Sequence, residues 1–255
     1  MDPSDILSSF ARNRQQVRDL VNFDTTLTDL VVESLRGLNR RWRDHLAEAH
    51  QMSGPTLEQH PLSGGRQLQM FSNIRDHESL KPGFRAIHNL ALVALVTFFS
   101  SACKGLFRAL AEVSFRSGNQ SFRTVPLKLT VGDLMNESDI GVVVCNALES
   151  SENLTFQDMK SINRAFAVVL GREIRRESHV NDIILAQASR HALVHADGNV
   201  DGKMLNQLRD ASPRTLKPQL DLGVPLSFSP EEIEQAGEAM ATYLASVAAS
   251  PTTAG

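Results

Sequence analysis

Three residues with chemically useful side chains lie close together in the segment Arg190-His191-Ala192-Leu193-Val194-His195. An imidazole titrates near neutrality, with a reference pKa of about 6.5, so His195 can accept or donate a proton under ordinary conditions. The guanidinium of Arg190 stays charged and presents a planar fork that fits phosphate oxygens. An imidazole beside a guanidinium predicts proton transfer at a phosphodiester, with His191 orienting His195 or binding phosphate. RNA suits such a site, because its ribose 2′-hydroxyl supplies the nucleophile and leaves a 2′,3′-cyclic phosphate.

The spacing of these residues constrains how their side chains can meet. On a regular helix, five positions rotate a side chain by about 140°, whereas four positions rotate it by about 40°. We therefore expect His191 and His195 to share a face, and Arg190 and His195 to lie on different faces. A cleft at a two-fold dimer interface would let Arg190 from either subunit reach one phosphate.

Two other interpretations of the same residues stay open. Histidines four positions apart also suit a metal pair, with Asp197 or Asp201 as a third ligand, although the glutamate of zinc-protease helices is missing between them. In a purely structural interpretation, Arg190 pairs with a carboxylate such as Asp197, while His195 caps a helix end.

A long apolar helix and the helix that carries the motif are the elements expected to position the site. Residues 82–115 form the most apolar segment, hydrophobic all round in its middle as a central bundle helix is, with Pro82 in its first turn. The motif segment has apolar residues at helical spacing from Val180 onward. Its helix is expected to end at Asp197-Gly198-Asn199, because Gly and Asn tolerate positive φ.

Capping residues and apolar stripes predict further helices on both sides of this pair. Ser229-Pro230-Glu231-Glu232 combines an N-cap serine, a proline at the first helical position and a glutamate at the third. Residues 140–146 fit either a short strand or a buried helical turn. Two helices are expected within 1–50, with Asp24 or Thr25 as the cap of the second, and a short helix is expected to begin at Thr130 with Asp133. Further helices are expected from Thr155 with Asp158 to Gly171, from 201 to 208 and from Ser229 to about Val247. Loops are expected at 53–81, 117–126 and 211–228.

Length and composition favour a single helical domain. The chain has 255 residues, of which 42% are hydrophobic and only 5% aromatic, and Leu and Ala recur throughout. We predict an all-α, up-and-down helical bundle with long loops and at most one short extended segment. It spans residues 1–248, and residues 249–255 form a disordered tail.

The charge balance requires any nucleic-acid site to be local. The formal net charge of −3 gives no global positive field. Arg172, Arg175 and Arg176 form a basic cluster ahead of the motif, which is either a substrate-binding surface or a solvated helix face. Asn199 in the turn after the motif is a further candidate for substrate binding.

The compartment is predicted from the cysteines and the apolar runs. Cys103 and Cys145 have no CxxC partner and lie in apolar surroundings, as buried free thiols do. The polar N-terminus lacks a signal-peptide apolar region, and the longest apolar run, at 90–99, is too short to cross a bilayer. We expect a cytoplasmic protein without membrane association, metal or cofactor.

The motif segment resembles the Arg-x4–6-His signature of HEPN domains. His191 fills the polar position that follows the arginine, and Asp-Gly-Asn-Val-Asp at 197–201 resembles the turn of the RiboL-PSP and related HEPN subfamilies. The resemblance is firmest over residues 82–248, which include the long apolar helix. Many HEPN proteins carry an acidic residue on that helix, where this chain has Ser100 and Ser101.

This resemblance implies a HEPN-type bundle that cleaves RNA without a metal. It also implies a homodimer that brings two motifs to one cleft, with Arg190, His191 and His195 as catalytic residues. Such proteins are common among toxins, antiviral effectors and RNA-processing enzymes, so a neutralising antitoxin protein is a candidate partner. The alternative function is a non-catalytic HEPN-like module that binds RNA, a nucleotide or a protein through Arg190 and His195.

Overall fold

The computed structural model describes residues 2–23, isolated positions between 26 and 41, and residues 81–118, 127, 129–132, 139–151, 154–174 and 177–250. Over these residues the chain is built from α-helices and contains no β-strand, which confirms the predicted all-α fold. The expected caps Asp24, Thr25 and Asp133, the expected loop over 53–80 and the tail residues 251–255 lie outside the described residues.

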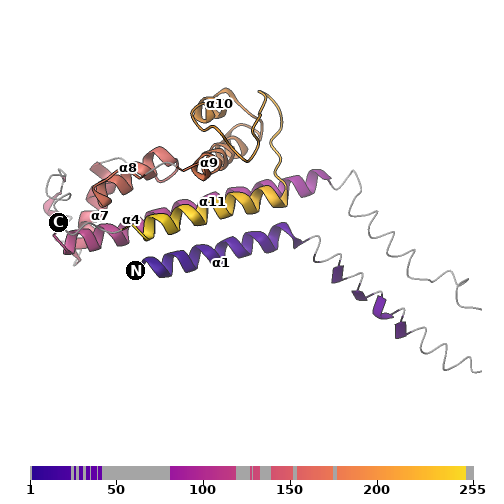
Figure 1. Ribbon diagram of the computed structural model, residues 1–255, viewed down its shortest axis with the longest axis horizontal. Helices are drawn as coiled ribbons and strands as arrows, with labels where there is room; N and C mark the ends of the chain where they lie inside the picture. Colours follow the sequence, from indigo (N-terminus) through magenta and orange to yellow (C-terminus); the bar gives the residue numbers. More distant parts are fainter. Residues whose placement is uncertain are drawn as a thin grey trace, which may run out of the picture.

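The described helices agree closely with the expected order along the chain (Figure 1). The one extended contact is an isolated antiparallel bridge between Asn199 and Pro225, within the part of the chain that the structure describes. The helices are α1 (Pro3–Val21), α4 (Lys81–Arg116), α7 (Ile140–Ser151), α8 (Met159–Leu170), α9 (His179–His195), α10 (Gly202–Leu208) and α11 (Pro230–Ala248).

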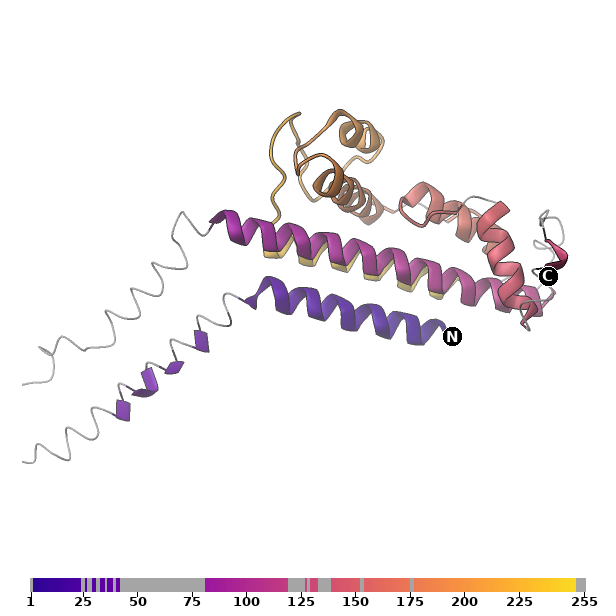
Figure 2. The same ribbon diagram turned by 180° about the vertical axis from the view of Figure 1, so that it is seen from behind.

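Three long helices, α1, α4 and α11, lie side by side, and α1 points in the opposite direction to the other two (Figures 1 and 2). Phe99 of α4 sits between them, with its ring edge-on to Phe10 of α1 at 6.3 Å and to Tyr243 of α11 at 6.0 Å between centroids. Tyr243 also contacts Phe166 of α8 at 6.4 Å. These buried aromatic contacts join four helices in one hydrophobic core.

Helix α4 is the longest helix among the described residues, and it matches the helix predicted over 82–115. Residues 82–116 meet the length and composition of a membrane-spanning helix, and they are the only described residues that do so. Half of the most apolar window is nevertheless buried inside the protein. A core helix of this kind passes the same test, so the described residues show no multi-span membrane protein.

Residues 140–146, which fit either a strand or a helical turn, belong to helix α7. Its side chains Val144, Cys145 and Leu148 are buried in the core. Glu149 of α7 accepts a hydrogen bond from Arg108 of α4 at 2.6 Å. Packing against α4 therefore decides the helical conformation of a segment with strand-like composition.

Helix α8 begins later than its sequence suggested. Asp158 is the N-cap, with its carboxylate accepting the Ser161 amide, and the helix ends at Gly171 as expected, with this glycine in the left-handed conformation. Phe156 has a positive φ of 51° and packs its ring on Phe107 of α4, which keeps the preceding residues out of the helix. Burial of this aromatic ring overrides the local helical pattern.

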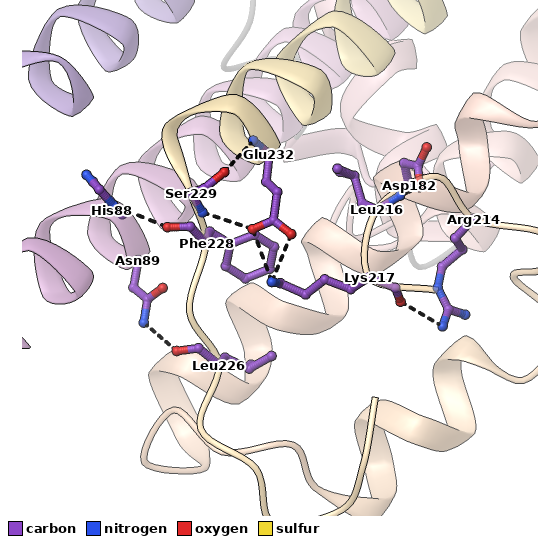
Figure 3. A network of polar contacts seen from close by, with 10 residues as sticks. All are labelled: His88, Asn89, Asp182, Arg214, Leu216, Lys217, Leu226, Phe228, Ser229 and Glu232. Atoms are coloured by element: carbon purple, nitrogen blue, oxygen red, sulfur yellow. Dashed lines mark hydrogen bonds and ion pairs between the residues drawn. The ribbon is translucent and has the colours of Figure 1, made fainter. Parts of the chain in front are cut away.

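The segment between α10 and α11 is tied to three helices by polar contacts (Figure 3). Asn89 of α4 donates to the Leu226 carbonyl, and Lys217 donates to both carboxylate oxygens of Glu232 on α11, at 2.9 and 3.1 Å. Asp182 of α9 accepts the amides of Thr215 and Leu216. Ser229 and Glu232 form the predicted capping box at the start of α11.

Candidate functional site

The motif occupies the last two turns of α9. Arg190 and His191 lie inside the helix, and His195 is its final residue. The helix stops because the next residues turn away, with Asp197 at φ 51° and Gly198 at φ 73°. The amide of Gly198 donates to the Ala192 carbonyl, which closes the turn that the sequence predicted.

A pocket of about 720 Å³ opens between α8, α9 and α10, and the motif contributes to it. Arg190 and His191 line it from α9, together with Gln187 one turn earlier. Lys160 lines it from α8 and Lys203 from α10. The pocket therefore gathers several cationic or titratable side chains from three helices.

His191 is the most constrained histidine of the site. Its Nε2 lies 2.9 Å from the Lys203 ammonium, and its ring centroid lies 4.8 Å from that of His195. Burial lowers the pKa of His191, the neighbouring Lys203, His195 and Arg190 lower that pKa further, and Asp201 opposes them. The lysine can donate only to an unprotonated nitrogen, so this geometry favours a neutral His191 whose Nε2 accepts a hydrogen bond.

The two faces of α9 separate the motif residues as their spacing predicted. His191 and His195 share a face, which the contact between their rings confirms. Arg190 lines the pocket, whereas His195 is exposed at the helix end and is not among the lining residues. One copy of the chain therefore does not aim Arg190 and His195 at a single point.

The two alternative interpretations of the motif receive different support. Among the described residues, Arg190 makes no ion pair with Asp197 or with another carboxylate, although His195 does occupy the helix C-terminus. The described part of the chain also contains no group of three His, Cys, Asp or Glu side chains that could hold a metal. Asp201, the suggested third ligand, instead caps α10 by accepting the Met204 amide at 2.7 Å.

Two of the substrate-binding residues expected from the sequence, Arg172 and Asn199, do not line the pocket. Arg172 is exposed beyond the end of α8, and Asn199 forms the backbone bridge with Pro225. Arg175 and Arg176 lie outside the described residues.

Sequence reasoning instead missed Gln187, Lys160 and Lys203. Their only signal was the helical periodicity that predicted α8, α9 and α10, and it did not show that these helices meet. On α4, Ser100 donates its hydroxyl to the Val96 carbonyl one turn earlier at 3.0 Å. This side chain therefore serves its own helix rather than replacing a carboxylate of the site.

The fold and the site define an all-α protein with a cationic pocket that carries a histidine of lowered pKa. Comparison of the chain with protein-family models, curated proteins and solved structures finds no match.

Proposed function

We propose that the protein binds RNA at the α8–α9–α10 pocket and cleaves it without a metal, as a HEPN-type endoribonuclease. The observation that carries this proposal is the grouping of His191 with Lys203 at 2.9 Å and with His195 at 4.8 Å between rings, beside Arg190. A neutral imidazole next to two permanent cations combines a proton acceptor with phosphate binding.

The proposed reaction uses four of these side chains. Arg190 and Lys203 hold the non-bridging oxygens of the scissile phosphate. When the Lys203 ammonium turns from His191 Nε2 to the phosphate, the unprotonated Nε2 takes the proton of the ribose 2′-hydroxyl as that oxygen bonds to phosphorus. The bond from phosphorus to the 5′-oxygen breaks, and His195 of a second copy, in its protonated form, gives that oxygen its proton. The products are a 2′,3′-cyclic phosphate and a free 5′-hydroxyl.

The pKa of His191 changes the roles that the sequence suggested. His195 was expected to act as the central acid or base, with His191 supporting it. Burial and the neighbouring ammonium of Lys203 lower the pKa of His191, which keeps this imidazole unprotonated and favours it as the base. His195, exposed at the end of α9, then acts as the proton donor.

A homodimer belongs to the same proposal. His195 faces solvent at the helix end while Arg190 lines the pocket, so a second copy can supply the His195 that one copy does not bring to the phosphate held by Arg190. We also propose a cytoplasmic toxin or antiviral role, with a neutralising antitoxin as partner. These roles rest on the HEPN resemblance.

A second candidate function is RNA or nucleotide binding without cleavage. The separation of Arg190 from His195 within one copy favours it, because a binding module needs the cationic pocket but no aligned acid. The two functions share their ligand. They differ in whether the RNA is cut.

Incubation of the purified protein with total RNA in EDTA tests both functions. Cleavage requires new ends with cyclic phosphates, and His191→Ala and Arg190→Gln should each abolish it. Val194→Ala is the matched control, because Val194 is exposed on the same turns of α9 and does not line the pocket. RNA that is bound but stays intact supports the binding module, and cutting by His191→Ala contradicts the proposed base.

A further inference from the structure

Gln187 stands out among the residues of the pocket. Its side chain is only 6% exposed and lines the pocket one turn before Arg190 and His191. Both its amide nitrogen and its amide oxygen are buried, and neither has a hydrogen-bond partner among the described residues. Burying a polar group without a hydrogen-bond partner costs free energy, so an unpartnered buried amide indicates a ligand that supplies the missing hydrogen bonds.

The surface around Gln187 suits a flat, partly apolar ligand. Met159 of α8 and Val180, Ile184 and Ala188 of α9 also line the pocket. These apolar side chains offer van der Waals contact to a ring. The volume of about 720 Å³ lies within the range of ligand pockets, which is about 300–1,000 Å³.

The charges of the same pocket lie beside this apolar surface. Lys160, Arg190 and Lys203 are cationic, and Asp158 and Asp210 are the carboxylates that line the pocket with them. Asp158 is already engaged in capping α8, where it accepts the Ser161 amide at 2.8 Å. Because the three cationic side chains outnumber the two carboxylates, the pocket favours a ligand with an anionic group at one end and an uncharged group at the other.

We propose that this pocket is a nucleobase subsite, in which the amide of Gln187 pairs with the edge of an RNA base while Arg190 and Lys203 hold the adjoining phosphate. The second half of this statement rests on the proposed function. An amide offers a donor beside an acceptor, the arrangement that pairs in two places with adenine, so adenine is the base expected to bind best. Residues 187 and 190 are separated by about 4.5 Å along the helix axis, which leaves one ribose between base and phosphate.

Calorimetric binding to the full chain tests the subsite. The probes are the 3′-monophosphates of the four nucleosides and, as the probe without a base, ribose 5-phosphate. At least one nucleotide, adenosine 3′-monophosphate first, should bind about tenfold more tightly than ribose 5-phosphate, because one amide pair contributes about 1–3 kcal/mol. Gln187→Met should remove this preference and leave the affinity for ribose 5-phosphate unchanged.

Two further variants separate the subsite from the proposed function. Arg190→Gln should weaken nucleotide and ribose 5-phosphate alike. Val194→Ala should change neither. Gln187→Met should fold with a melting temperature at least equal to that of the parent, because it removes an unpartnered buried amide.

Each failure has a distinct signature. If no nucleotide binds better than ribose 5-phosphate, or if Gln187→Met keeps the preference, the nucleobase subsite is wrong while the phosphate site stands. If neither kind of probe binds, the subsite and the proposed function both fall.

Discussion

The carboxylate of Asp182 should be a main determinant of how the segment between α10 and α11 is held. Asp182 is 7% exposed, and its Oδ1 accepts the amide of Thr215 at 3.0 Å and that of Leu216 at 2.9 Å. Leu216 is itself buried at 2% exposure, so water cannot replace the lost partner of its amide without opening the core. Figure 3 shows this carboxylate beside the chain at Leu216.

We expect Asp182→Ala to lower the free energy of unfolding by about 3–6 kcal/mol, since each hydrogen bond to a charged group contributes about 1.5–3 kcal/mol. A melting temperature changes by about 2–4 °C per kcal/mol in a chain of this size, so it should fall by at least roughly 6 °C. Asp182→Asn keeps an acceptor oxygen in place but loses the charge. It should cost about half as much as the alanine variant.

Thermal unfolding followed by far-ultraviolet circular dichroism measures these changes. Hydrogen exchange at the Thr215 and Leu216 amides shows whether the segment opens locally. Asp221→Ala is the matched control, because Asp221 is exposed in the same segment and its side chain makes no hydrogen bond to a described residue. An Asp182→Ala variant that unfolds at the same temperature as this control, or in which the Thr215 and Leu216 amides exchange no faster than in the parent, would refute this role of the carboxylate.

Three further predictions concern the site and the core. Lys203→Gln removes a positive charge beside His191, so the pKa of His191 should rise toward its ordinary value, as an NMR titration would measure. Because the base must be unprotonated, the acidic limb of the pH–rate profile for RNA cleavage should move to higher pH in the same variant. Ser229→Ala breaks the capping box of α11 and should cost about 1 kcal/mol in denaturant unfolding, whereas Ser229→Asp should cost less. Phe99→Ala should cost about 3–5 kcal/mol, since its ring is fully buried between α1 and α11.

Each of these predictions has a result that contradicts it. An unchanged pKa of His191 in Lys203→Gln would mean that the ammonium does not act on the imidazole in solution. Equal stability of Ser229→Ala and the parent would mean that the capping box does not stabilise α11. A loss for Phe99→Ala no larger than that for Val113→Ala, an exposed position of the same helix, would contradict the central place of Phe99 in the core.

Local interactions made much of the fold predictable from sequence. The capping box at Ser229 and Glu232 and the end of a helix at Gly171 each depend on residues within a few positions, so they were predictable from the sequence. The same holds for the shared face of His191 and His195, which four positions on a helix impose.

What only the tertiary structure decided depends on which helices meet. Packing on α4 made residues 140–151 helical, and the buried ring of Phe156 delayed the start of α8. The sequence by itself determined the chemical types in the motif, an arginine and two histidines on a helix that ends in a glycine turn. Contact between α8, α9 and α10 decided that Lys203 meets His191, that Gln187 is buried at the pocket and that Arg172 and Asn199 stay away from it. Such contacts join residues distant along the chain, and helical periodicity fixes the face of one helix but not its neighbour.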